Sequence, residues 1–187
     1  MSIRSLLLVV LSAWPALAGQ TTEEAWKLWS AGERAKALDI LVERLAESPS
    51  DARLRTGIVE AELSVQRFEA ALAHSEGLPP ESAGLRGRAL YFLTRYPEAL
   101  EHLGDAREER LMRAECLRAL ARFDELDALV AQLVKDLGED DLDVLLLVAR
   151  AHLRRGEDAE AIPLLRRVLA ARPLEPEALF ALGRALV

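Results

Sequence analysis

Two similar eighteen-residue segments stand far apart in the chain, and this internal repeat constrains the fold more than any other feature. GERAKALDILVERLAESP runs from Gly32 to Pro49, and GEDAEAIPLLRRVLAARP runs from Gly156 to Pro173. In both copies a glycine is followed by apolar residues at three- and four-residue intervals, and a proline closes the phrase. Because that interval places the apolar residues on one helical face, each copy predicts a turn and an amphipathic helix that ends before the proline.

Three weaker copies lie between these two, and each places an aromatic residue just after the expected turn, at Phe68, Tyr96 and Phe123. Aligning the five copies gives one reference position in each, at Ala37, Ala71, Ala99, Leu126 and Ala161. Twelve residues earlier stand Ala25, Val59, Gly87, Ala114 and Ala149. Small residues allow two antiparallel helices to approach closely, so each copy predicts a helical hairpin.

Taken together, the period, the small residue of the first helix, the alanine of the second and the closing proline resemble tetratricopeptide repeats. The resemblance implies an all-α fold, a right-handed α-solenoid of about five helical hairpins plus a terminal helix. The repeats are expected at residues 19–51, 52–79, 80–105, 106–139 and 140–174, and the terminal helix at 175–187. Gly77 and Gly104 predict that the second helices before them are short. A solenoid tolerates such departures because each hairpin contacts only its neighbours.

The first eighteen residues have the pattern of a secretory signal peptide. Arg4 supplies a positive charge, an apolar segment follows, and Ala16-Leu17-Ala18 fits a cleavage site. Cleavage is expected after Ala18, which predicts a periplasmic or secreted protein. The apolar segment is shorter than the ~20 helical residues that span a bilayer, so an uncleaved anchor is the weaker alternative.

The composition excludes several classes of partner. The chain carries 31 acidic and 24 basic residues, a formal net charge of −7. An acidic chain lacks the cationic surface that phosphate backbones require, so nucleic acid is not expected as a partner. Leu, Ala, Glu and Arg dominate while aromatic residues are scarce, as is typical of helical proteins.

The sequence offers no recognisable catalytic or metal-binding constellation. His74, His102 and His152 are far apart, and none has metal-ligand or nucleophile–base spacing. The acidic run 138–143 lacks the alternating order of a calcium loop, and its aspartates are better explained as caps of a helix starting near Leu142. The sequence therefore predicts no cofactor, no metal and no enzymatic activity, with an unrecognised enzyme as a minor alternative.

In tetratricopeptide repeats the first helices line a concave groove, and the resemblance assigns groove positions in this chain. The principal candidates are Trp26, Trp29, Arg53, Arg88, Tyr91, Arg118, Arg150, Arg154 and Arg184. Arginine and aromatic side chains are enriched at binding hot spots, so the expected ligand is a protein or peptide segment with acidic groups or a free carboxyl terminus. The alternative is that these arginines pair with glutamates on a solvated surface, because the chain has only three lysines. The chain contains no Asn, so the family's carboxylate clamp of Lys, Arg and Asn is not reproduced.

The favoured function is an exported interaction scaffold or adaptor in a bacterial envelope, with no membrane insertion after cleavage. The alternative is a structural accessory subunit of an envelope assembly machine, for a pilus, a cytochrome or the outer membrane. Such a subunit would be engaged through its convex face or its terminal helix. The terminal helix around Gly183 leaves an apolar face uncovered, which also predicts a possible homo-oligomer.

Overall fold

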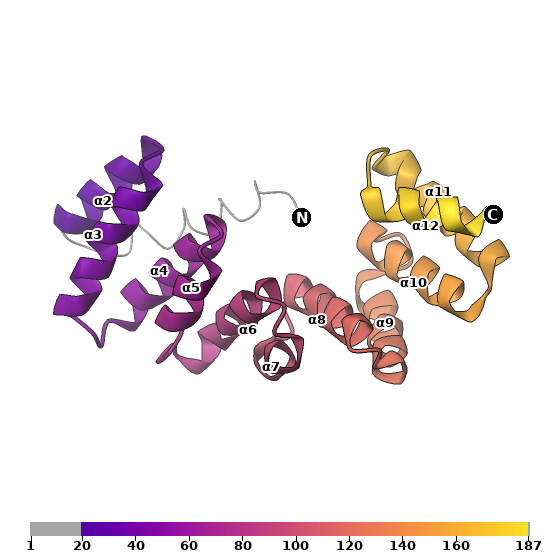
Figure 1. Ribbon diagram of the computed structural model, residues 1–187, viewed down its shortest axis with the longest axis horizontal. Helices are drawn as coiled ribbons and strands as arrows, with labels where there is room; N and C mark the ends of the chain where they lie inside the picture. Colours follow the sequence, from indigo (N-terminus) through magenta and orange to yellow (C-terminus); the bar gives the residue numbers. More distant parts are fainter. Residues whose placement is uncertain (1–19, 187) are drawn as a thin grey trace. The chain divides into compact units, whose positions relative to one another are not determined.

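The computed structural model describes residues 20–186, with side chains from Glu23 onward, so the predicted signal peptide lies outside the described residues. Every regular element in this range is a helix (Figure 1). The chain forms two compact units, one through Cys116 and the other from Leu117. The prediction of an all-α fold is confirmed.

The first unit contains three helical hairpins and most of a further helix. Its helices are α2 (Gln20–Ser30), α3 (Arg34–Glu47), α4 (Ala52–Ser64), α5 (Phe68–His74), α6 (Ala83–Phe92) and α7 (Tyr96–His102), with a 3-10 turn, η2 (Pro80–Ser82), before α6. The hairpins are α2 with α3, α4 with α5, and α6 with α7; α3 packs against α4, and α5 against α6. Helices α5 and α7 have seven residues each, as the glycines that follow them predicted.

Helix α8 (Arg107–Ala119) runs from the first unit into the second. The second unit continues with α9 (Phe123–Leu137), α10 (Leu142–Arg155), α11 (Asp158–Ala171) and α12 (Pro176–Ala185). Helix α10 packs against α9 and α11, and α12 packs against both α10 and α11. The predicted class of five helix–turn–helix repeats and a terminal helix is confirmed.

Small residues let the helices of a hairpin approach closely, as their spacing predicted. Ala25 and Ala37 are fully buried in one cluster between α2 and α3, and Ala149 and Ala161 are fully buried in another between α10 and α11. At Gly87 a Cβ atom would lie 2.6 Å from the backbone nitrogen of Leu103. The backbone at the end of α7 therefore occupies the space that a side chain at this position needs.

Each hairpin turn has the same backbone geometry. One or two residues after the first helix a residue has a positive φ, and its N–H and the next N–H bond to carbonyls three and five residues earlier, which is a Schellman motif. Glycine takes this position at Gly32 and Gly156, whereas Gln66, Thr94 and Ala121 take it elsewhere with φ of 63°, 59° and 55°. Non-glycine residues are strained in this region, so three turns store conformational strain.

One arginine joins the first two hairpins through backbone carbonyls. The guanidinium of Arg55 on α4 donates to the carbonyl oxygens of Pro49 (2.8 Å) and Glu76 (3.0 Å). These carbonyls lie in the turns that follow α3 and α5, where backbone acceptors have no helical partner and need one from elsewhere. Arg55 thus fixes the ends of two second helices to one first helix.

The turn at Thr94 yields a stability prediction. Thr94→Gly is expected to raise the free energy of unfolding by about 1 kcal/mol, because a β-branched residue is strained at positive φ and glycine is not. Gly156→Ala is expected to lower it by about 1 kcal/mol, although a Cβ there would meet no atom within 4 Å. Urea denaturation measures both changes, and a loss of stability in Thr94→Gly would contradict the strain assigned to this turn.

Candidate partner-binding face

The predicted binding residues of the first two hairpins differ in the solvent exposure of their side chains. Trp26 on α2 is half-buried, whereas Trp29 is 5% exposed and belongs to the core cluster between α2 and α3. The guanidinium of Arg34 lies 5.6 Å from the centre of the Trp29 ring. Arg53 on α4 is exposed. Trp26 and Arg53 therefore offer surface to a partner, and Trp29 offers little.

Helices α4 and α6 pack against each other and bring Glu60 close to Arg88. One carboxylate oxygen of Glu60 and Nε of Arg88 are buried, and neither makes a hydrogen bond within the described structure. Burial raises the pKa of the Glu60 carboxyl, and the positive charge of Arg88 partly offsets this effect. Arg88 therefore already faces a carboxylate of its own chain.

An aromatic cluster surrounds Tyr91 at the end of α6. Its ring lies edge-on to Phe92 at 5.3 Å and tilted against Tyr96 at 6.2 Å. Phe92 stacks on Phe68 at 4.6 Å and is 37% exposed. Aromatic pairs of this kind hold rings in fixed positions. The cluster joins the second and third hairpins and leaves part of one ring open.

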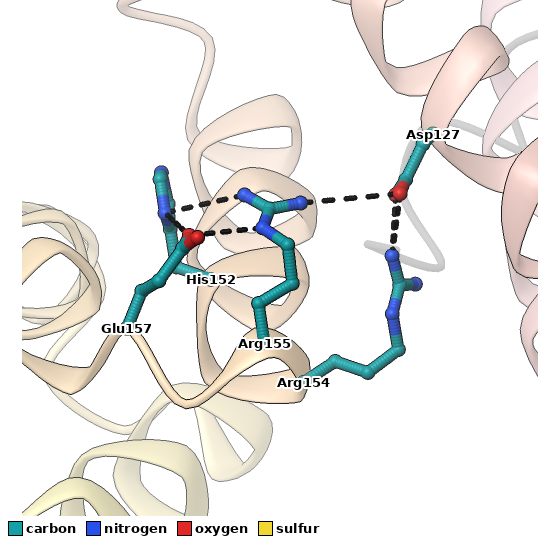
Figure 2. Close-up of polar contacts among 5 residues, drawn as sticks. All are labelled: Asp127, His152, Arg154, Arg155 and Glu157. Carbon is teal, nitrogen blue, oxygen red and sulfur yellow. Dashed lines mark hydrogen bonds and ion pairs between the residues drawn. The ribbon is translucent and has the colours of Figure 1, made fainter.

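In the second unit, two of the predicted arginines form ion pairs with a neighbouring helix. Arg150 on α10 donates to Glu177 on α12 at 2.6 Å. Arg154 on α10 donates to both carboxylate oxygens of Asp127 on α9 at 2.6 Å, and Figure 2 shows these two side chains facing each other. The guanidinium of Arg154 also lies 4.5 Å from the centre of the Phe123 ring. These side chains hold α9, α10 and α12 together.

The turn between α10 and α11 extends this network (Figure 2). Nδ1 of His152 lies 2.7 Å from Glu157, and Nε of Arg155 donates to the same carboxylate oxygen at 2.9 Å. Two hydrogen bonds hold the pKa of Glu157 below its ordinary value: the one from His152 has the larger effect, and the one from Arg155 the next largest. A second nitrogen of Arg155 lies 3.9 Å from Asp127. Asp127 thus contacts two arginines at the end of α10, Arg154 and Arg155.

Arg118 and Arg184, the last two predicted arginines, are exposed at the ends of α8 and α12. Within each unit the first helices therefore carry several arginine and aromatic side chains. The expectation that some of these arginines pair with acidic residues describes Arg150 and Arg154, whereas Arg88 only exerts its charge on the nearby Glu60. Their role in binding a partner remains a prediction.

The local sequence pattern around these arginines does not indicate their acidic partners. Asp127 precedes Arg154 by 27 residues, Arg150 precedes Glu177 by 27, and Asp140 precedes its partner Arg167 by 27. This spacing is the signal that could have revealed them, because equal separation recurs when successive repeats stack. An acid and an arginine at that separation are candidates for an inter-repeat ion pair.

A buried acid in the second hairpin was also missed. Glu62 on α4 is 1% exposed, and both its carboxylate oxygens lie 3.0 Å from Nδ1 of His74 on α5. Burial raises the pKa of the Glu62 carboxyl, and the hydrogen bond from His74 and the charges of His74 and Arg67 partly offset this effect. Leu28 and Leu90 take the same position in the hairpins on either side. The second hairpin therefore buries a carboxylate where its neighbours have leucine.

The acidic loop before α10 serves as a helix cap, as predicted. One carboxylate oxygen of Asp141 accepts hydrogen bonds from the N–H groups of Asp143 (3.0 Å) and Val144 (3.1 Å). In the part of the chain that the structure describes, no cluster of three or more His, Cys, Asp or Glu side chains could hold a metal ion. Among the same residues, no helix is long and apolar enough to cross a membrane.

Comparison with known proteins identifies the fold. Residues 142–185 match the family model described as tetratricopeptide repeat. The crystal structure of YrrB, a TPR protein with an unusual peptide-binding site, aligns with a TM-score of 0.61 at 19% identity, over 84% of this chain and 87% of YrrB. TTC0263, a thermophilic TPR protein in Thermus thermophilus, aligns with a TM-score of 0.54 at 20% identity, over 88% of this chain and 96% of that protein. No curated protein sequence gives a significant match.

The buried Glu62 carboxyl predicts a pH dependence of stability. Its pKa is higher in the folded chain than in the unfolded chain, so its contribution to stability is complete below the unfolded pKa and is lost as the pH rises through the folded pKa. Glu62→Gln removes the buried charge and keeps an acceptor for His74. The variant is expected to be more stable than the parent at pH 7, by up to about 1 kcal/mol, with the difference shrinking toward pH 4.

Urea denaturation across this pH range provides the measurement. Glu69→Gln is the control, because it removes one negative charge from an exposed position of the same hairpin. A stability difference between Glu62→Gln and the parent that grows as the pH falls would contradict the assignment.

Proposed function

We propose that this chain, a tetratricopeptide-repeat protein, is an exported scaffold that binds an acidic protein or peptide segment along its first helices. The arginine and aromatic side chains of those helices carry the proposal, and the repeat fold supports it because such repeats are generally non-catalytic interaction scaffolds. The peptide-binding site for which YrrB is described gives a precedent in the same fold.

Export rests on the leader of residues 1–18, with cleavage after Ala18 and residence in the periplasm or outside the cell. The −7 net charge fits a protein partner better than a nucleic acid. The described helices also lack a segment able to cross a membrane. The proposed adaptor thus works in solution within a bacterial envelope, without catalysis or cofactor.

The internal ion pairs limit which arginines a partner can bind. A carboxylate of the partner must either displace Asp127 or Glu177 from its arginine or use arginines outside those pairs. Arg53 and Arg184 are exposed, and neither contacts an acidic side chain in the described part of the chain. These two arginines are therefore expected to meet a partner first, and their loss should leave the fold intact.

A second candidate function is a structural subunit of an envelope assembly machine, held through its terminal helix. The observation that favours it is the exposure of Leu179 (48%) and Leu186 (60%) on and beside α12. Exposed apolar surface of this kind is typical of protein–protein contacts. A homo-oligomer through the same helix belongs to this candidate.

The first proposal predicts a charge-dependent capture. The full chain, tagged at its carboxyl terminus, is isolated from the periplasm of a Gram-negative host, and its amino terminus is expected at Gly19. Cross-linking in place followed by mass spectrometry then compares the parent with Arg53→Glu/Arg184→Glu. The double variant is expected to lose about tenfold in partner recovery, because arginine contacts at such surfaces contribute more than about 1 kcal/mol each.

Lys36→Glu/Lys135→Glu is the matched control, since it makes the same charge change at exposed positions of α3 and α9. Equal partner recovery from the arginine variant and the parent would refute binding along the first helices. An uncleaved chain in the cytoplasm would refute export.

A further inference from the structure

Helices α4 and α6 meet along a seam in which polar side chains of the two helices face each other. Near the start of this seam, the hydroxyl of Thr56 on α4 lies 3.5 Å from that of Ser82, just before α6. One turn further along α4, Glu60 lies near Arg88 of α6. Because Thr56 precedes Glu60 and Ser82 precedes Arg88, the two helices run in the same direction. The α4–α6 seam therefore leads from a pair of hydroxyls to a pair of opposite charges.

An exposed charge and an exposed ring flank this charge pair. Arg53 is exposed and stands seven residues before Glu60, about two turns, so both residues lie on the same side of α4. One turn beyond Arg88, Phe92 stacks on Phe68 of α5 at 4.6 Å and remains 37% exposed. A positive charge, the charge pair and an aromatic ring thus follow one another along the first helices.

Glu60 and Arg88 lie near each other without bonding. Both side chains are half-buried, and one carboxylate oxygen of Glu60 and Nε of Arg88 are buried with no hydrogen bond among the described residues. Burial outweighs the charge of Arg88 in its effect on the pKa of the Glu60 carboxyl, which is raised. Buried charges cost stability when no bonded partner compensates them. The pair is therefore incomplete within the described structure.

Other arginines of the first helices do reach a neighbouring carboxylate. Arg150 takes on α10 the position that Arg88 has on α6, directly after the small residue of its helix. It donates to Glu177 on α12 at 2.6 Å. Arg154, on the same helix as Arg150, reaches both carboxylate oxygens of Asp127 at the same distance. Arg88 differs from these arginines in that its carboxylate neighbour is not bonded to it.

A group that bonds to both side chains of the pair must be a donor and an acceptor at once. The Glu60 carboxylate accepts hydrogen bonds, and the Arg88 guanidinium donates them. A carboxylate of a partner would be repelled by Glu60, and an ammonium group by Arg88. A carboxamide is neutral and carries both an N–H and a carbonyl oxygen. It also stands at the end of a side chain, which reaches half-buried groups more easily than a backbone does.

We propose that Glu60 and Arg88 bind the carboxamide of an asparagine or glutamine in the partner segment. Its N–H donates to Glu60, and its carbonyl oxygen accepts from Arg88. The inference rests on the proposed function, because it specifies one contact of the segment that binds along the first helices. Specificity arises because an apolar or charged side chain in the same place leaves one or both groups unpaired.

The neighbouring side chains set the spacing of the segment. Arg53 lies about 10 Å before Glu60 along α4, and Phe92 lies about 6 Å beyond Arg88 along α6. An extended segment rises about 3.3 Å per residue, so its acidic residue stands about three residues from the carboxamide and an apolar residue about two residues away on the other side.

The first probe is a phage-displayed library of random dodecapeptides, selected on the purified full chain. The parent is expected to enrich peptides with Asn or Gln at one position. Glu60→Gln is expected to shift that position to Asp or Glu, because Arg88 then has no carboxylate beside it. Arg88→Gln is expected to shift the same position to Lys or Arg, because Glu60 then has no guanidinium beside it.

The reversed pair, Glu60→Arg/Arg88→Glu, is the matched variant. A carboxamide fits a reversed pair after rotation about its side-chain bond, so this variant is expected to keep the preference for Asn or Gln. Glu69→Gln is the control at an exposed position of α5 and is expected to leave the preference unchanged. Circular dichroism and urea denaturation verify that every variant folds.

The second probe is a selected peptide labelled with fluorescein, and its affinity is measured by fluorescence anisotropy. Replacing its Gln by Met, or its Asn by Leu, keeps a side chain of similar size and is expected to weaken binding by about tenfold, because both groups of the pair lose a hydrogen bond. Equal affinity of the two peptides, as a bridging water or a backbone amide would give, would overturn the proposal. A preference that stays unchanged in Glu60→Gln and Arg88→Gln, or a selection without enriched peptides, would overturn it as well.

The outcome is separable from that of the proposed function, which Arg53→Glu/Arg184→Glu tests by capture in the periplasm. Charge-dependent capture together with a peptide preference that ignores the pair would refute the carboxamide contact alone. A preference that follows the pair, together with undiminished capture by the arginine variant, would refute capture through the exposed arginines alone.

Discussion

The close approach of two helix backbones at a small residue is the constraint on which the rest of the structure depends. At Gly87 the end of α7 occupies the place of a side chain, and Ala25 and Ala149 sit in equally closed contacts. This contact sets the distance between the helices of a hairpin, and thereby the register in which neighbouring hairpins pack. A Schellman turn then fixes the reversal of direction in each repeat, even where Thr94 or Ala121 must adopt a positive φ.

Hairpins held in this way bring charged side chains of successive repeats together at fixed places. The ion pairs of Arg154 with Asp127 and of Arg150 with Glu177 arise from that stacking and occupy two arginines of the face that is proposed to bind a partner. In the proposed function, binding there is a competition between internal and external carboxylates for the same guanidinium groups.

Much of the fold could be predicted because the local signals agree with one another. Glycine at the turn, apolar residues at helical intervals and proline after the helix located α3 and α11, and Gly77 and Gly104 explained the short α5 and α7. The candidate site was harder to predict from the sequence, because packing between helices decides which residues of the first helices remain exposed. Trp26 and Trp29 occupy neighbouring positions of one face, yet Trp29 is buried against α3. The partners of Glu62 and Arg154 depend on contacts between distant residues, which a local pattern does not encode.

The central claim is that a small residue in the first helix, at the position of Gly87 and Gly183, makes room for the second helix. Replacing each of these two glycines by alanine tests it. Gly87→Ala is predicted to lower the free energy of unfolding by about 1–2 kcal/mol, because its Cβ would lie 2.6 Å from a backbone nitrogen. Gly183→Ala, with open space around it, is predicted to raise the free energy of unfolding by up to about 1 kcal/mol. Changes of the same sign at both sites in urea denaturation would contradict the account.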